Sequence, residues 1–574
     1  MTPQAPDHAE ERLAEECEDA IPVRGYQLQR IVGLGGSAGA IPALVSFLQS
    51  TTPGGLAYVV ILHLSPEHES TLAQLLQRHT PMPVMQVREA VSVEPDTVYV
   101  IPPRHALEMF EGELRLGAMP TERPGRVAVD LFFRTLADSH GPHATAIVLS
   151  GMDSDGAIGI KRIKERGGLT IAQDPQEAQH DGMPRSAIRT GMVDWVLPVA
   201  DMPARLARYV ELERQLSLPP ERLQEHPDRQ LLQGAESELI DVLSFLRTRT
   251  GRDFANYKRA TILRRIGRRM QVNGVHDLNG YLACLRTRPG EPGALLQDLL
   301  ISVTNFFRDS DCFEALERQI VSITEQKPPG EVIRVWVAAC ATGEEAYSVA
   351  ILLAEHLDGL EAPPAVQIFA TDLDEEAIRV AREGVYPLTI AADVSEERLR
   401  RFFIKEHRGY RVRRELREQV LFAAHDVLKD SPFSRLDLIT CRNLLIYLNR
   451  DAQRRVFETA HFALAAEGRL FLGASETVDE NSPLFRVVDK KHRIYAPRHV
   501  PRKSLPMPAG SASGARVRDT AGETRAGPAT PGPVPALNGQ DSAAHRALKL
   551  PAGRAVSWAE LHFKMLELLA RRRS

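Results

Sequence analysis

Strand–helix alternation occurs twice in this 574-residue chain, and no other feature constrains its fold as much. Short apolar runs alternate with helical stretches over residues 28–213 and again from 332 to about 497. This pattern is typical of doubly wound α/β domains with mostly parallel sheets. Residues 236–300 carry helical patterns only. We therefore predict two α/β domains, the second spanning 301–497 and preceded by a small all-helical subdomain.

Four further segments have compositions unlike those of a packed domain. Residues 1–27 are acidic and polar, and residues 498–554 are rich in Pro, Ala, Gly and Ser, so we expect both to be disordered. The polar, proline-bearing stretch 214–235 is expected to be a linker. Residues 555–574 combine a capping pattern with apolar residues at helical spacing, which predicts an amphipathic helix; a partly ordered tail is the alternative.

Composition excludes several classes of protein. The formal net charge of −4 argues against a general nucleic-acid binder. The five cysteines form no C-x-x-C pair, which indicates a reducing compartment and no zinc site, and we expect no metal. The N-terminus does not resemble a signal peptide, and no apolar run reaches the roughly 18 residues of a membrane span. We expect a cytoplasmic protein that does not insert into membranes.

The segment IVGLGGSAGA, residues 31–40, fits two motifs. Gly33, Gly35 and Ala38 match the dinucleotide fingerprint, in which glycines cradle a pyrophosphate. Gly35, Ser37 and Gly39 match the nucleophile elbow, in which a serine stands on a strained turn between strand and helix.

The residues that follow favour the elbow. A dinucleotide site needs an acid after the next strand, but YVVILHL ends at His63, an imidazole suited to act as a base. Asp153 and Asp155 follow the strand ATAIVLSG, and Asp155 is better placed because it directly precedes the next helix. We therefore predict Ser37 as nucleophile, His63 as base and Asp155 as the acid that orients the base. The order Ser, His, Asp differs from that of α/β-hydrolases.

The segments GLGGSAGA, HLSPEHES, LSGMDSDGAIGIKRIKERGGLTIAQD and DGMPRSAI together resemble the catalytic domain of CheB-type protein-glutamate methylesterases, over about residues 28–213. The resemblance implies hydrolysis of γ-glutamyl methyl esters and, often in that family, deamidation of glutamine. It also implies that the backbone N–H of Met152 helps to form the oxyanion hole. Arg185 in DGMPRS either lines the site or forms a structural ion pair.

The second α/β unit also shows a strand, a glycine turn and a helix, in VIRVWVAACATGEEAYS. It has no P-loop, and Glu344 and Glu345 at the helix start would repel phosphates. Asp372, at the end of the next strand, is suited to a ribose diol, and Asp426 could accept from an adenine amino group. Adenosine contacts without a phosphate cradle predict S-adenosylmethionine.

The segments ISVTNFFRD, VWVAACATGEEAYS, FATDLDEEAI, GVYPL, LDLITCRNLLIYL and LFLGASE resemble CheR-type chemotaxis receptor glutamate O-methyltransferases, over about residues 236–497. In this resemblance Arg308 would hold the substrate carboxylate and Tyr447 would orient it, unless both are structural polar residues. Ser302 stands where some members carry Asn. The resemblance implies cofactor contacts at Ser302, Thr304, Arg308, Glu345, Asp372, Asp426, Val427, Arg442 and Asn443.

A basic helix is predicted within YKRATILRRIGRRM, where six basic residues fall between Lys258 and Arg269. Ile262, Ile266 and Met270 form one apolar stripe. A solvated helix face, a nucleic-acid contact and docking onto an acidic receptor helix bundle are the alternatives, and we favour receptor docking. The stretch RRFFIKEHRGYRVRREL is short for the inserted subdomain that binds a receptor tail peptide in this family, so we expect no dependence on such a peptide.

Together these features predict a bifunctional enzyme that makes and removes glutamyl methyl esters. The implied partners are the cytoplasmic helices of a chemoreceptor, with a histidine kinase or response regulator as further partners. Only about 27 residues precede the first strand, so we expect no receiver domain there. The alternatives are a regulatory scaffold in which one or both halves bind without turnover, and the same chemistry on a target outside chemotaxis.

Overall fold

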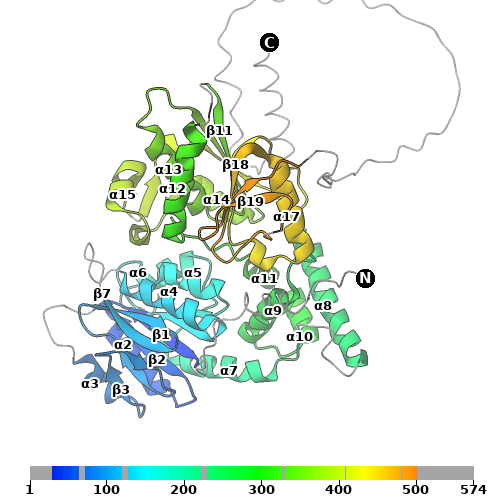
Figure 1. Ribbon diagram of the computed structural model, residues 1–574. Coiled ribbons are helices and arrows are strands. Elements are labelled where there is room, and N and C mark those ends of the chain that lie inside the picture. Colours follow the sequence, from blue (N-terminus) through cyan, green and yellow to red (C-terminus); the bar gives the residue numbers. More distant parts are fainter. Residues whose placement is uncertain are drawn as a thin grey trace, which may run out of the picture.

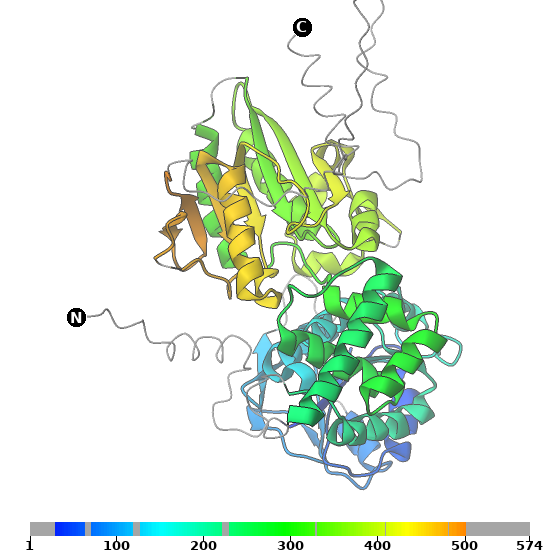
Figure 2. The same ribbon diagram turned by 90° about the vertical axis from the view of Figure 1, so that its right-hand side faces the viewer.

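The computed structural model describes residues 29–63, 71–118, 127–220, 229–325, 327, 330–407, 409–479 and 481–500. The predictions for residues 1–27, for 501–554 and for the terminal helix fall outside these ranges. The two α/β domains lie one above the other, and the helical subdomain lies beside the first of them (Figures 1 and 2). Within the described ranges, no helix has the length and apolar character needed to cross a membrane.

The first α/β domain is built on a seven-stranded sheet in the order β10-β9-β8-β1-β2-β5-β3, with every neighbouring pair parallel. Its strands are β1 (Ile31–Gly36), β2 (Ala57–Leu62), β3 (Val84–Gln86), β5 (Val98–Val100), β8 (Ala144–Val148), β9 (Leu169–Gln173) and β10 (Trp195–Leu197). Its helices are α2 (Ala40–Ser50), α3 (Leu72–Gln77), α4 (Ala128–His140), α5 (Ala157–Glu165), α6 (Gly182–Arg189) and α7 (Met202–Gln215). The predicted fold class is confirmed. A separate antiparallel sheet, not predicted, contains β4 (Val91–Ser92), β6 (His105–Phe110) and β7 (Glu113–Ala118).

Helices cover both faces of this sheet, which explains why its strands read as continuous apolar runs. Phe47 of α2 belongs to the core on one face, and Phe132 and Phe133 of α4 belong to the core on the other. All three rings are fully buried, and each contributes about 1.5–3 kcal/mol of transfer free energy. The helices thereby fix the ends of the strands, where the predicted catalytic residues lie.

The helical subdomain consists of α8 (Arg229–Thr250), α9 (Arg259–Asn273), α10 (Leu278–Thr287) and α11 (Glu291–Leu300). The predicted apolar stripe of α9 is buried in its core, where Ile266 and Met270 join Val242 of α8 and Tyr281 of α10.

The second α/β domain has a seven-stranded sheet in the order β16-β12-β11-β17-β18-β20-β19, parallel from β16 to β18 and antiparallel beyond. Its strands are β11 (Val332–Ala338), β12 (Ala365–Asp372), β16 (Val420–Ala424), β17 (Leu436–Cys441), β18 (Leu464–Leu472), β19 (Phe485–Asp489) and β20 (Ile494–Pro497). Its helices are α12 (Ser310–Glu325), α13 (Glu344–Leu357), α14 (Glu375–Glu383), α15 (Glu396–Phe402), α16 (Arg414–Arg417) and α17 (Arg450–Ala463).

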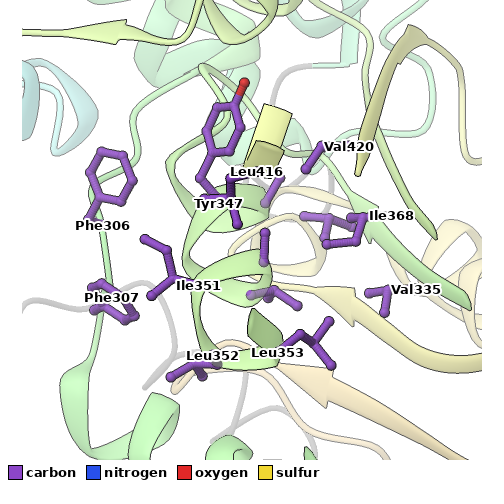
Figure 3. Close-up of a cluster of buried hydrophobic side chains, with 14 of the residues drawn as sticks. Phe306, Phe307, Val335, Tyr347, Ile351, Leu352, Leu353, Ile368, Leu416 and Val420 are labelled. Atoms are coloured by element: carbon purple, nitrogen blue, oxygen red, sulfur yellow. The ribbon is translucent and has the colours of Figure 1, made fainter. Parts of the chain in front are cut away.

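Helix α13 is the centre of the core on one face of this sheet. Figure 3 shows Tyr347, Ile351 and Leu353 on α13 among the side chains of this core, which also includes Val335 and Ile368 from the sheet. The fully buried α13 side chains hold the start of the helix against the carboxyl ends of β11 and β12. A small three-stranded antiparallel sheet flanks this core, with β13 (Val385–Tyr386), β15 (Gly409–Val412) and β14 (Phe403–Glu406) in that order. The stretch RRFFIKEHRGYRVRREL therefore supplies β14 and β15 of this small sheet.

The basic helix α9 does not present a receptor-docking surface, so that expectation is wrong. Arg265, Arg268 and Arg269 are only 2%, 4% and 7% exposed, and the other three basic residues are half-buried. Arg265 donates to the Lys164 carbonyl at 2.9 Å, and Arg268 donates to the Gly168 carbonyl at 2.9 Å. Carbonyls at a helix end lack partners within the helix and attract cations, so α9 binds the end of α5 instead of a receptor.

Candidate functional sites

Ser37 stands on a tight turn between β1 and α2. Its N–H donates to the Ser150 carbonyl at 2.9 Å, and its carbonyl accepts from the Ala40 N–H at 3.1 Å. Gly39, at φ 77°, adopts the left-handed conformation that the turn requires. A Cβ on Gly39 would come within 2.8 Å of the side chains of Gln179 and Ser150. The turn thus matches the local geometry of the predicted elbow.

His63 lies beside Ser37 because of the strand register. Gly36 of β1 pairs with Leu62 of β2, so the residues that follow each strand are neighbours. The His63 N–H donates to the Gly36 carbonyl at 3.4 Å. The His63 Nε2 lies 2.8 Å from Asp155 Oδ2, and its Nδ1 lies 3.5 Å from Asp153 Oδ2. Both candidate acids reach the ring, and Asp155 makes the shorter contact.

Asp155 is buried and held by backbone donors as well as by His63. Its Oδ2 accepts from the Val129 N–H at 2.9 Å, and its Oδ1 accepts from the Asp130 and Gly156 N–H groups at 2.8 and 2.9 Å. Val129 and Asp130 lie in the first turn of α4, where free N–H groups and the helix dipole favour a negative charge. The site therefore holds this carboxyl group at a fixed position beside the imidazole.

Asp130 is a neighbouring acid that sequence reasoning missed. It is fully buried, and its Oδ1 accepts from the Gly159 N–H at 2.6 Å. Burial, and next the charge of Asp155, raise the pKa of Asp130 well above its ordinary value. This shift favours the neutral acid, and the hydrogen bond to Gly159 ties α4 to α5. Its position within the helical run VAVDLFF gives no signal of this role.

Of the remaining predicted residues, Met152 lies in the loop after β8 and Arg185 lies on α6. The Gly151 N–H donates to the His180 carbonyl at 2.9 Å, and among the described residues we find no acceptor for the Met152 N–H. The Met152 side chain is 70% exposed. Its N–H therefore has the free donor capacity that an oxyanion hole needs. Arg185 forms an ion pair with Asp181, which corresponds to the structural alternative for that residue.

A second site lies at the carboxyl edge of the second sheet. One pocket brings eight of the predicted residues together: Ser302, Thr304, Arg308, Glu345, Asp372, Arg442, Asn443 and Tyr447. Asp426 lines an adjoining cavity, and Tyr257 and Leu300 line both. Val427 lines neither of these two cavities and packs against the core around Trp336 instead.

Asp372 follows the pattern expected of a ribose-binding acid at the end of β12. Its Oδ2 accepts from the Ala341 N–H and its Oδ1 from the Asp374 N–H, both at 2.8 Å. Burial raises the pKa of Asp372 to about 6, although these backbone donors oppose it. The Ser302 hydroxyl donates to Asp374 at 2.8 Å, so Ser302 supports the pocket wall.

Arg442 supplies a buried positive charge in the same pocket. Its Nη2 donates to the Arg308 carbonyl at 2.9 Å and to Asp309 Oδ2 at 2.8 Å, and its Nη1 lies 3.5 Å from Glu345 Oε2. Within the described residues, neither Nη1 nor Nε of Arg442 makes a hydrogen bond. Buried donors without partners are rare and indicate a missing acceptor.

The hydrogen-bonding groups of this pocket fit S-adenosylmethionine. Asp372 suits the ribose hydroxyls, and the unsatisfied guanidinium of Arg442 suits the carboxylate of the methionyl group. Glu345 adds a buried acid that suits the ammonium group.

The same pocket also concentrates backbone strain, which no sequence motif signals. Four non-glycine residues that line it adopt positive φ values between 46° and 59°: Ile301, Ala339, Ala341 and Asn443. Such conformations cost about 1–3 kcal/mol each and cluster at functional sites.

Comparison with known proteins covers each of these units. Residues 32–206 match the family described as CheB methylesterase. Residues 237–300 match the CheR methyltransferase all-alpha domain, and residues 302–494 match the CheR methyltransferase SAM binding domain.

Relatives match the units separately or together. A protein named putative methyltransferase Cher3, from Pseudomonas putida, is 36% identical over 42% of this chain and 90% of its own length. Protein-glutamate methylesterase FrzG from Myxococcus xanthus is 34% identical over 34% of this chain and 58% of its own length. An uncharacterized 104.1 kDa protein from Rhodobacter capsulatus is 39% identical over 74% of this chain, which spans only 46% of that relative. Among solved structures, the Thermotoga maritima CheB methylesterase catalytic domain is 28% identical over 31% of this chain and 97% of its own, with a TM-score of 0.29.

Proposed function

The chain belongs to the CheR chemotaxis methyltransferases and carries a CheB methylesterase domain before that unit, and we propose that it adds methyl groups to, and removes them from, glutamate side chains of a chemoreceptor. S-adenosylmethionine is the cofactor of the CheR unit. The observation that carries the proposal is the presence of both sites in one chain: the Ser37 turn with His63 and Asp155, and the pocket around Asp372 and Arg442.

In the proposed hydrolysis, the Ser37 hydroxyl attacks the ester carbonyl and gives its proton to His63. Asp155 holds the imidazole and stabilises its protonated form, as its 2.8 Å contact allows. The Met152 N–H donates to the oxyanion. Methanol leaves with the proton from His63, and water then releases the glutamate by the reverse sequence. A γ-amide would react in the same way and release ammonia, which is the proposed deamidation.

In the proposed methylation, the bound S-adenosylmethionine supplies a methyl group on a sulfonium. Asp372 accepts from the ribose hydroxyls, Asp426 accepts from the adenine amino group, and Arg442 binds the methionyl carboxylate. Arg308 holds the acceptor carboxylate of the glutamate side chain, and Tyr447 orients it. Methyl transfer is an in-line displacement, so the residues contribute mainly by positioning the two reactants.

The proposed substrate is a membrane receptor whose cytoplasmic helices carry the glutamates, which places the enzyme in the cytoplasm. A histidine kinase or a response regulator is a further proposed partner, because methylation of a receptor has a signalling effect only when the receptor controls such a protein. The chain itself supplies the two opposing activities, and the proposal requires that they act on the same side chains.

The test uses methyl-labelled S-adenosylmethionine, the purified full chain and chemoreceptor fragments in membranes. We expect wild type to release labelled methanol, and Ser37→Ala to accumulate base-labile label on the receptor. Ser46→Ala, a serine variant on α2 outside the site, should behave as wild type. Equal label in wild type and Ser37→Ala without methanol would contradict the esterase half. If cofactor binds but no variant transfers label, the regulatory scaffold replaces the proposal.

A further inference from the structure

A glutamate of the first α/β domain contacts an arginine that lines the cofactor pocket of the second. Glu165, the last residue of α5, is 6% exposed, and its Oε1 accepts from Nη2 of Arg308 at 2.8 Å. Its Oε2 accepts from Arg162 at 2.7 Å. Arg308 is the residue to which the acceptor carboxylate is assigned above. The side chain that contacts it is itself a glutamate, the residue type that the enzyme modifies.

The contact lies in a cleft between the two domains. This cleft, of about 180 Å³, shares Val303, Thr304 and Arg308 with the cofactor pocket. Arg134 of α4 bridges its edge with two hydrogen bonds to Asp393, at 2.9 and 3.0 Å. In Figure 1, α4 and α5 lie on the side of the first domain that faces the second. Glu165 and Arg308 line this cleft together.

Two nitrogens of the Arg308 guanidinium already donate hydrogen bonds. Its Nη1 donates to the Val303 carbonyl at 3.2 Å, and its Nη2 donates to Glu165. Burial raises the pKa of Glu165, but Arg308 and Arg162 outweigh it and lower the pKa to about 2. Glu165 is therefore a carboxylate at every physiological pH. A second carboxylate that approaches the same position on Nη2 would lie against the negative charge of Glu165 and compete with it for this charge-assisted bond.

We propose that Glu165 is an internal substitute for the substrate. Its carboxylate occupies the acceptor-carboxylate position on Arg308, and it must be displaced before a receptor glutamate is methylated. The inference rests on the proposed function, since it assumes that the acceptor is a glutamate held by Arg308. Arg162, which also contacts Asp138, keeps Glu165 in place after displacement, so the exchange is reversible. The methylesterase domain thereby limits the methyltransferase of the same chain.

The test compares wild type with Glu165→Gln in the full chain. The amide preserves the shape of the side chain but removes the charge that competes for Arg308. We expect the KM for receptor fragments to fall about tenfold, because more of the enzyme is in the binding-competent state. The kcat at saturating receptor and the Kd for S-adenosylmethionine should stay within about twofold of wild type. A purely structural ion pair would change the melting temperature but not KM.

Asp138→Asn is the matched control, since Asp138 lines the same cleft and binds Arg162 without contacting Arg308. It should leave KM unchanged, and Glu165→Ala should lower KM as Glu165→Gln does. Calorimetric binding of the receptor fragment provides a readout without turnover. Tighter binding by Glu165→Gln, even if no variant transfers methyl groups, would support the substitute role while contradicting the proposed function. Equal KM and equal binding in wild type and Glu165→Gln, or the same change in Asp138→Asn, would overturn the inference.

Discussion

Arg268 of the helical subdomain and Asp194 of the first α/β domain form an ion pair across the domain boundary, with side chains only 3% and 0% exposed. Lys164 lies 2.6 Å from Asp194 and 2.8 Å from Asp298, and Arg268 lies 2.5 Å from Asp298. The four side chains thus form a closed ring of ion pairs. Each domain contributes one cation and one carboxylate. Separation of the domains therefore breaks the contacts from Arg268 to Asp194 and from Lys164 to Asp298, while each domain keeps one ion pair of its own.

Arg268→Ala should destabilise the chain by about 3–5 kcal/mol, because it removes a buried positive charge that contacts both Asp194 and Asp298. The measurement is the free energy of unfolding in guanidinium chloride, followed by circular dichroism. Arg264→Ala on the same helix, where the guanidinium is half-buried and makes no hydrogen bond within the described residues, should cost less than about 1 kcal/mol. Equal losses in the two variants would mean that the network does not stabilise the domain contact.

Asp155→Asn should lower the methylesterase kcat by about 10³–10⁴-fold with little change in KM, since the amide no longer stabilises the protonated imidazole. Asp153→Asn is the control, because Asp153 also approaches the ring, at 3.5 Å, but is partly exposed. It should cost less than about tenfold in kcat. Steady-state hydrolysis of methylated receptor separates the two. A larger loss of kcat in Asp153→Asn than in Asp155→Asn would show that Asp153, and not Asp155, orients the imidazole.

Asp130→Asn should leave the methylesterase rate at pH 7 within about twofold of wild type, because burial raises the pKa of Asp130 and so favours its neutral acid form. The amide oxygen preserves the acceptor for the Gly159 N–H, and the amide nitrogen takes the place of the protonated oxygen. The same hydrolysis assay checks this. A rate loss comparable to that of Asp155→Asn would show that Asp130 acts as a charged group.

Cofactor affinity should weaken as the pH falls, because the pKa of Asp372 is raised to about 6. The ionised carboxylate of Asp372 accepts hydrogen bonds from the ribose hydroxyls. As the pH falls through about 6, Asp372 gains a proton and this acceptor is weakened. The Kd for S-adenosylmethionine should therefore rise about tenfold between pH 7 and pH 5. Calorimetry at each pH provides the measurement. Asp372→Asn should bind weakly at both values with a flat profile, and a flat profile in wild type would contradict the assignment.

The sequence was sufficient for two mostly parallel sheets, because most of their strands appear as apolar runs that alternate with helical stretches. It was also sufficient to place Ser37, His63 and Asp155 at one sheet edge, because parallel strands bring their carboxyl ends together. The antiparallel strands β6 and β7 were missed, since their short alternating pattern lies between stronger signals.

The environment of the basic helix could not be predicted for a different reason. Helical periodicity shows which residues share a face, but not what covers that face. The partners of Arg268 lie 30 positions away at Asp298 and 74 positions away at Asp194, in different domains. The contact between Glu165 and Arg308 spans 143 positions and leaves no local pattern at either residue. Such contacts depend on how whole domains pack.

The carbonyls of Lys164, Glu165 and Gly168 each accept from an arginine of α9. Any amino acid supplies a backbone carbonyl, so these hydrogen bonds persist when side chains of the first domain are substituted during evolution. The acids that pair with the arginines cannot be substituted in the same way. Recombination that exchanged either half for a free-standing homologue would remove the contacts of Arg268 and Arg269 with Asp194. Once two such genes share one reading frame, selection therefore keeps them together, and the two enzymes are inherited as a single unit.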